Sequence, residues 1–164
     1  MILKVLKIET WIGDATNCYI VQDEKSKETM VIDPAGDVDK IIEMLDILQA
    51  KLKYIYLTHC HGDHIGGVKE LKERYGGTIV AQRAAAENLR DLNINLTTYI
   101  GNKGLTIEVD ARVDDEDLLH LGELEFKVIH TPGHTSGGSC LYCEQEKLLF
   151  SGDTLFRGTW GRTD

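Results

Sequence analysis

Residues 59–64 concentrate side chains that bind metal ions. The segment reads His59-Cys60-His61-Gly62-Asp63-His64, so three of the chain's six histidines and one aspartate fall within six positions. Imidazole nitrogens suit zinc, and a carboxylate can complete or bridge such a site. Histidines at positions i and i+2 of an extended loop can point to the same side and converge on one ion. The spacing predicts a metal site and disfavours a solvent-facing loop that happens to contain histidines.

Two later segments repeat this arrangement. The strand-like run "FKVI" leads into a glycine-rich loop that carries His134, and "KLLF" leads into a loop that carries Asp153. Segment 59–64 itself follows the apolar run "KLKYIYLT". Ligand sites in open α/β sheets favour the carboxyl ends of strands. We therefore expect the three loops to supply ligands to one site.

The rest of the sequence predicts the elements that position these loops. Apolar patterns and turn signals predict strands at 2–9, 17–22, 28–33, 51–58 and 78–82, and helices at 37–50, in 68–77 and at 84–92. After a polar stretch at 93–117, further strands are expected within 118–132, 138–145 and 146–153, with tight turns at Gly122 and at 144–147. Alternating strands and helices indicate an α/β layer structure. Without a linker or repeat, residues 1–164 are predicted to form a single domain.

The composition limits the possible partners. The chain has 164 residues, 42% of them hydrophobic, and a formal net charge of -9. This charge disfavours nucleic acid as a partner, since nonspecific binding depends on neutralising phosphates. An anionic substrate must instead find a local positive site, for example a bound metal. The N-terminal residues show neither a secretory signal nor a membrane span, so no membrane association is expected.

The four cysteines are too few for a disulfide scaffold, which favours a reduced, cytoplasmic chain. Cys140 and Cys143 form an isolated C-x-x-C pair within a predicted strand, and we interpret them as packed side chains rather than as a metal or redox site. Cys60 lies between two predicted ligands. Alternation along an extended loop turns its thiol away from them, so it too is expected to be a packed residue.

The motifs together resemble a known family. Six residues match, in order and context, the metal ligands of the metallo-β-lactamase superfamily: His59, His61, Asp63, His64, His134 and Asp153. The segments "TPGHTSGG", "SGDTLF" and "GRTD" resemble more narrowly its glyoxalase II-like group, the hydroxyacylglutathione hydrolases. The similarity covers essentially the whole chain. It implies an αβ/βα sandwich, in which two mixed sheets face each other with helices outside and a binuclear metal centre along one edge.

The resemblance also implies the role of each ligand. His59, His61 and His134 are expected on the first metal, Asp63 and His64 on the second, and Asp153 between the two. Zinc is the expected metal, as two ions, with iron or manganese as possible substitutes. Asp33, which ends a predicted strand, is expected either to support the ligand loop or only to start a turn before Pro34.

Other branches of the superfamily differ at individual positions. His61 stands where related diiron flavoproteins usually carry glutamate, and Asp153 stands where the best-known zinc β-lactamases carry cysteine. Members that process nucleic acid usually have further domains and a basic surface. The persulfide dioxygenases, which use one iron, share a "GR-x-D" segment and remain an alternative.

Several residues outside the motif have weaker assignments. His120 and His130 are expected to be structural or surface residues. Arg162 and Asp164 could form an ion pair behind Asp153. In the stretch 93–117, Tyr99 and Lys103 are the best candidates for substrate contact, although an ordinary surface loop is the simpler interpretation.

The leading hypothesis is a metallo-hydrolase that cleaves a thioester of S-lactoylglutathione type. Water shared by two cations has its pKa lowered toward ~7, and the metal-bound hydroxide attacks the thioester carbonyl. Asp63 and Asp153 are the predicted catalytic residues, which position this hydroxide. The alternatives are a mononuclear-iron persulfide dioxygenase and an incomplete metal-binding domain without turnover.

The position at which the sequence ends leads to a further expectation. Glyoxalase II-like proteins continue after "GRTD" into a helix, a strand and a "PGH"-type loop whose histidine completes the second metal site. All six histidines of this chain already have a role. We therefore expect a fold without that helix and strand, a weakly bound second metal and low turnover, or a homo-oligomer in which a second copy supplies the missing parts. Apolar residues in 124–129 and 147–150 are expected to be exposed.

Overall fold

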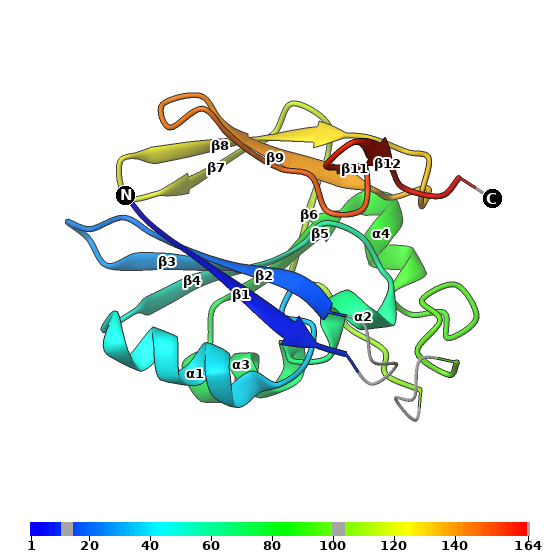
Figure 1. The fold of residues 1–164 in the computed structure, drawn as a ribbon, viewed down its shortest axis with the longest axis horizontal. Helices are drawn as coiled ribbons and strands as arrows, with labels where there is room; N and C mark the ends of the chain where they lie inside the picture. The colour runs from blue at the N-terminus through cyan, green and yellow to red at the C-terminus, as the bar shows by residue number, and fades with distance from the viewer. Residues whose placement is uncertain (11–14, 100–103, 164) are drawn as a thin grey trace.

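The computed structural model describes residues 1–10, 15–99 and 104–163. Two β-sheets lie face to face, and helices cover the outer face of the larger sheet (Figure 1). This arrangement confirms the predicted α/β sandwich, but the described strands of the smaller sheet all pair antiparallel, so this sheet is not mixed as expected. Within the described residues, no helix covers the outer face of the smaller sheet.

The larger sheet has the strand order β1-β2-β3-β4-β5-β6. Its strands are β1 (Ile2–Glu9), β2 (Ala15–Gln22), β3 (Glu28–Ile32), β4 (Lys51–Leu57), β5 (Thr78–Gln82) and β6 (Ala111–Val113). The first three strands pair antiparallel, and β3 to β6 pair parallel. The parallel half therefore places the carboxyl ends of β3, β4 and β5 along one edge.

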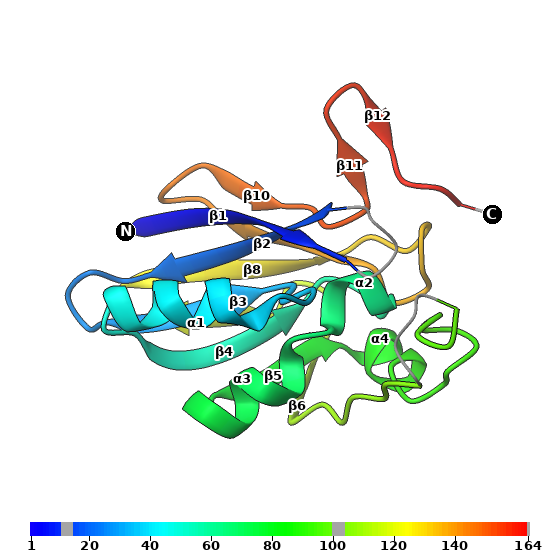
Figure 2. The same ribbon diagram turned by 60° about the horizontal axis from the view of Figure 1, so that its bottom comes forward.

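The smaller sheet is antiparallel, with the order β10-β9-β8-β7. Its strands are β7 (Leu118–Leu121), β8 (Leu124–His130), β9 (Ser139–Cys143) and β10 (Leu148–Phe150). A two-stranded hairpin, β11 (Leu155–Phe156) with β12 (Thr159–Trp160), follows β10 and projects from the sandwich (Figure 2). The predicted turn at Gly122 is confirmed, and its φ of 58° is one that glycine adopts without strain.

In the described part of the chain, four helices connect the strands of the larger sheet: α1 (Val38–Ile47), α2 (Gly62–Ile65), α3 (Val68–Tyr75) and α4 (Arg83–Asn88). Helices α1 and α3 contact each other and lie below the sheet in Figure 1. The buried side chains of α1 are Ile41, Ile42 and Leu45, which face the sheet at helical spacing. None of the helices within the described residues is long and apolar enough to cross a membrane.

The core has two layers because neighbouring strand residues point to opposite faces. Val31 and Ile55 pack with the helices, whereas Met30 and Tyr56 pack between the two sheets. Phe126 joins the second group from the smaller sheet and is fully buried. The larger sheet is thus apolar on both faces, which holds the edge that carries the candidate site in place.

Two sequence-based expectations need correction, and one hairpin was not predicted. The stretch 93–117 contains β6, which pairs with β5, so it is not only a surface loop. The hairpin β11–β12 was not predicted. In segment 124–129 the apolar side chains Leu124, Phe126 and Val128 are buried because they face the larger sheet, so the expected exposure is wrong for these residues. In segment 147–150 the expectation is confirmed at Leu149, which is 46% exposed.

Candidate metal centre

The predicted loops meet at one end of the sandwich. His59 follows β4, His134 follows β8 and Asp153 follows β10, as the strand pattern indicated. The backbone N–H of Ser139 at the start of β9 donates to the carbonyl of Thr58 at 2.9 Å, which ties the two sheets together beside the ligand loop. Residues that are far apart in the chain are therefore held against one another by backbone hydrogen bonds.

The loop after β4 enters helix α2 at Gly62, a position where a side chain would not fit. The Gly62 N–H donates to the carbonyl of Asn95 at 2.8 Å, and a Cβ on Gly62 would lie 2.8 Å from a methyl of Thr97. Asn95 is fully buried, and its side chain bonds to the carbonyls of Leu89 and Leu105. The stretch that the sequence presented as a polar loop thus supports the ligand loop from outside.

His59, His61 and His134 form the first group of potential ligands, with ligand atoms within 4.8 Å of one another. The His61 Nδ1 and His134 Nε2 atoms are 3.0 Å apart. His134 Nδ1 lies 3.0 Å from the carbonyl oxygen of Arg162, which can only accept, so this nitrogen carries the proton. The Nε2 lone pair of His134 is thereby directed at the group.

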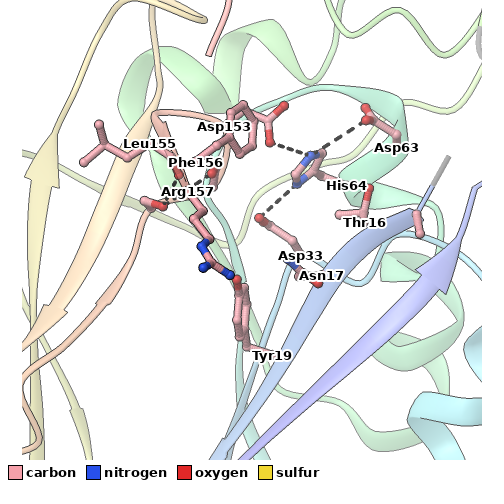
Figure 3. A pocket seen from close by; sticks show the side chains of 13 residues that line it. Thr16, Asn17, Tyr19, Asp33, Asp63, His64, Asp153, Leu155, Phe156 and Arg157 are labelled. Atoms are coloured by element: carbon pink, nitrogen blue, oxygen red, sulfur yellow. Dashed lines mark hydrogen bonds and ion pairs between the residues drawn. The ribbon is translucent and has the colours of Figure 1, made fainter. Parts of the chain in front are cut away.

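His59, His64 and Asp153 form the second group, so His59 belongs to both. The two carboxylate oxygens of Asp153 face different histidines. Oδ1 is 3.3 Å from His64 Nε2 (Figure 3). Oδ2 is 3.5 Å from His134 Nε2. This position suits a bridging ligand. Asp63 lies outside both groups, with its Oδ2 3.8 Å from His64 Nε2.

Asp33 orients two of these histidines and is itself 1% exposed. Its Oδ2 accepts hydrogen bonds from His64 Nδ1 at 3.0 Å and from the Thr58 hydroxyl at 2.7 Å, and its Oδ1 accepts from the Thr58 N–H at 2.8 Å. Because the Thr58 hydroxyl donates to Asp33, its oxygen is free to accept from His59 Nδ1, 3.1 Å away. One carboxylate therefore fixes the proton positions of both imidazoles, as outer partners of metal-binding histidines do.

The environment separates the protonation states of these side chains. Burial and neighbouring histidines lower the pKa of His59 well below its usual value and that of His61 to about 4. Burial also opposes charge on His64, but Asp33, Asp153 and Asp63 outweigh it and raise the pKa of His64 to about 10. Burial raises the pKa of Asp153, and the hydrogen bond and charge of His64 reverse this and lower it. His59 and His61 are therefore neutral donors of the kind that a divalent cation requires, whereas His64 carries a proton that it must release to bind a metal.

The donor set fits zinc in one further respect. His59 Nε2 is buried and has no hydrogen-bond partner among the described residues. A buried polar atom without a partner is costly, so a native structure satisfies it in some way. Since Nδ1 of His59 faces Thr58, Nε2 carries the lone pair and points into the two groups. A metal ion bound between the two groups would accept the lone pair of His59 Nε2 and so provide the missing partner.

The remaining sequence candidates lie apart from the two groups. His120 is exposed near Glu125, and His130 Nε2 contacts the carbonyl of Ser136. All four cysteines are free and buried, and Cys60 packs in the core below the sheet as expected. Tyr99 is 72% exposed. Lys103 and Asp164 lie outside the described residues, so their suggested roles stay predictions.

Sequence reasoning missed Thr58 and Asn95, which position the ligand loop without binding metal. For Asp33 it left a supporting role and a simple turn equally open, and the contacts to His64 and Thr58 favour the supporting role. The strand end at Asp33-Pro34 was a signal for Asp33. No sequence signal identified Asn95, because its burial depends on contacts with residues from other segments.

Comparison with known proteins agrees with this fold. A family model described as the Metallo-beta-lactamase superfamily matches residues 11–164. The chain belongs to the metallo-β-lactamase superfamily.

Two relatives and one solved structure illustrate the similarity. A hydroxyacylglutathione hydrolase of Pelagibacter ubique is 37% identical over 138 residues, which are 84% of this chain and 50% of that protein. A probable polyketide biosynthesis zinc-dependent hydrolase of Bacillus subtilis is 30% identical over 93% of this chain and 61% of its own length. The chain thus spans about half to three fifths of these relatives. A crystal structure of BLEG-1 B3 metallo-β-lactamase superposes with a TM-score of 0.88 at 32% identity, covering 99% of this chain and 77% of that one.

Proposed function

We propose that the chain is a metal-dependent hydrolase that cleaves a thioester of S-lactoylglutathione type. The observation that carries the proposal is the position of Asp153, whose two oxygens face the two groups of histidine ligands. One group is formed by His59, His61 and His134, and the other contains His64. The similarity to hydroxyacylglutathione hydrolases supports the thioester as substrate.

The proposed chemistry divides between metal and protein. His59, His61, His64, His134 and Asp153 would hold zinc, as two ions, which would supply a water of lowered pKa and favour negative charge on the carbonyl oxygen. Asp153 and Asp63 line the pocket beside the site (Figure 3). Their carboxylates are placed to accept hydrogen bonds from the attacking water and orient it. Asp33 holds His64 in one orientation, so the water meets a fixed set of groups.

The partners and location are part of the proposal. The substrate is a small thioester, nucleic acid and membranes are not partners, and the reaction takes place in the cytoplasm. A second copy of the chain is the proposed source of any further ligand to the second metal.

Hydrolysis of S-lactoylglutathione by the zinc-loaded protein tests the proposal. Turnover should disappear with a chelator and return with zinc, while the His120→Ala variant should keep it because His120 is exposed and lies outside both groups. A chromogenic β-lactam tests the activity suggested by the BLEG-1 likeness. Oxygen uptake with a glutathione persulfide and iron tests the dioxygenase. Turnover of either alternative without thioester hydrolysis would overturn the proposal.

A further inference from the structure

A pocket of about 370 Å³ opens beside the candidate metal centre (Figure 3). On one side it is lined by Asp63, His64 and Asp153, and on the other by Tyr19 and Arg157. If the reacting carbonyl of a substrate lies beside Asp63, His64 and Asp153, the rest of the substrate occupies the same pocket. The second side therefore determines which substrates fit.

Arg157 is the one lysine or arginine among the described residues that line this pocket. It occupies the turn of the β11–β12 hairpin, between Phe156 and Gly158, and the φ of 85° at Gly158 allows the chain to reverse there. In Figure 3 the Arg157 side chain extends from the hairpin toward Tyr19. The hairpin thus directs a permanent positive charge into the pocket.

Arg157 has no ion pair or hydrogen bond within the described part of the chain. Three carboxylates line the same pocket, but each is engaged elsewhere, since Asp33, Asp63 and Asp153 all surround His64. The chain has a net charge of -9, yet none of these three carboxylates pairs with Arg157. The Arg157 guanidinium is therefore available for a ligand. Arginine binds carboxylates through two parallel hydrogen bonds, which gives direction as well as attraction.

Tyr19 provides a second donor at the same place. Its ring packs edge-on against Phe150, with centroids 5.1 Å apart and an interplanar angle of 72°. Burial and the charge of Asp33 raise the pKa of Tyr19, so the phenol keeps its proton at neutral pH and can donate it. The neutral hydroxyl and the guanidinium both favour an oxygen anion over a neutral group.

We propose that Arg157, assisted by Tyr19, binds a carboxylate group of the substrate and makes the enzyme select anionic thioesters. The inference rests on the proposed thioesterase function and specifies the class of its substrate. Arg157 acts here as a specificity-determining residue, and the bond-breaking groups remain those at the metal centre.

Three thioesters test this selectivity and locate the carboxylate. S-acetyl-N-acetylcysteamine is neutral, S-acetyl-3-mercaptopropionate carries a carboxylate on the thiol, and S-glutaryl-N-acetylcysteamine carries one on the acyl group. The wild-type protein should prefer one of the anionic compounds by about 10-fold in kcat/KM, the ratio expected from one charged hydrogen-bonded contact. The preferred compound shows which side of the thioester faces Arg157.

The Arg157→Ala variant should lose this preference, because its kcat/KM should fall about 10-fold on the preferred anionic compound and much less on the neutral one. Arg157→Lys keeps the charge without the planar fork, so it should retain part of the preference, and Tyr19→Phe should reduce it less than Arg157→Ala does. Arg112→Ala removes an exposed arginine paired with Glu87 and is the matched control. An equal loss of activity on all three compounds in Arg157→Ala shows a structural role and overturns the proposal.

A binding measurement separates this inference from the proposed reaction. NMR titration of the zinc-loaded protein with 3-(methylthio)propionate, and with its neutral amide, reports carboxylate binding without turnover. The wild type should bind the carboxylate about 10-fold more tightly than Arg157→Ala does. If no thioester is cleaved but this difference is present, the thioesterase fails and the anion site stands. If both proteins bind the carboxylate equally, the anion site is refuted.

Discussion

Asp33 accepts a hydrogen bond from His64 Nδ1 at 3.0 Å and, through Thr58, also orients His59. Replacing such an outer partner of a metal-binding histidine typically weakens metal affinity by about 10- to 100-fold. Asp33→Asn should therefore bind zinc more weakly by a factor in this range while all six predicted ligands remain. Competition with a fluorescent chelator measures the affinity.

The matched control for Asp33→Asn is Asp39→Asn, which removes an exposed aspartate from the first turn of α1. Its zinc affinity should equal that of the wild type. If Asp33→Asn also bound zinc with unchanged affinity, the hydrogen bond to His64 would serve only the fold.

His59→Ala and His134→Ala should each reduce the number of zinc ions bound per chain, because both residues belong to the first group of ligands and His59 also belongs to the second. They should also reduce the stabilisation by zinc, which for a tight site is about 2.7 kcal/mol at a free concentration of 100 times Kd. Elemental analysis and thermal unfolding with added zinc measure the two effects. His120→Ala serves as the control, and wild-type zinc content in either ligand variant contradicts the assignment.

Asp153→Ala and Asp63→Ala should differ in their effects on the two metal sites. The oxygens of Asp153 face both His64 and His134, so its loss should weaken both sites. Asp63 forms an ion pair with His64 and lies outside both groups, so its loss should weaken mainly one site. A zinc titration that resolves two binding steps tests this difference. Small, equal losses with unchanged stoichiometry would rule out a bridging role for Asp153.

Part of the site was predictable because its signals are local. The pattern from His59 to His64 needs only an extended loop, and the apolar runs before His134 and Asp153 identify both as strand-end residues. The two packed sheets follow from the alternation that sends Val31 and Met30 to opposite faces.

Other features could not be predicted because they depend on contacts between distant segments. Strand β6 has only three residues, and the sequence around it is polar; its pairing with β5 makes it a strand. Asn95 is buried because the ligand loop packs against it at Gly62. Arg157 belongs to the pocket only because the β11–β12 hairpin faces Tyr19 from β2.

The stability of the β2–β3 turn should depend on pH through Asp23. The backbone N–H and the hydroxyl of Ser26 donate to Asp23 Oδ2 at 2.9 and 2.7 Å, and these bonds lower the pKa of Asp23. Since the folded pKa lies below the unfolded value of about 3.9, the charged form stabilises the fold above that pH, and this contribution is lost as the pH falls through the folded pKa.

Asp23→Asn should therefore lower the free energy of unfolding by about 1 kcal/mol at pH 7, the difference between charged and neutral hydrogen bonds. The gap between variant and wild type should narrow below about pH 4. Urea unfolding of both proteins at pH 7, 5 and 3.5 measures it. A gap that stays constant over this range shows that the charge of Asp23 does not contribute.

The loop that carries His134 should depend on the absence of a side chain at Gly137. A Cβ at this position would lie 2.0 Å from the backbone nitrogen of Ala85 in α4, so loop and helix could not keep their present distance. At Gly133, in the same loop, a Cβ would meet only a methyl of Thr163 at 3.8 Å, which is an ordinary contact. Gly137→Ala should lower the free energy of unfolding by about 1–3 kcal/mol, as overpacking does, and should also weaken zinc binding because His134 moves with the loop. Gly133→Ala should change neither quantity appreciably. Urea unfolding and zinc titration of the two variants test whether the close approach of this loop to α4 sets the position of His134. Equal behaviour of both variants would show that it does not.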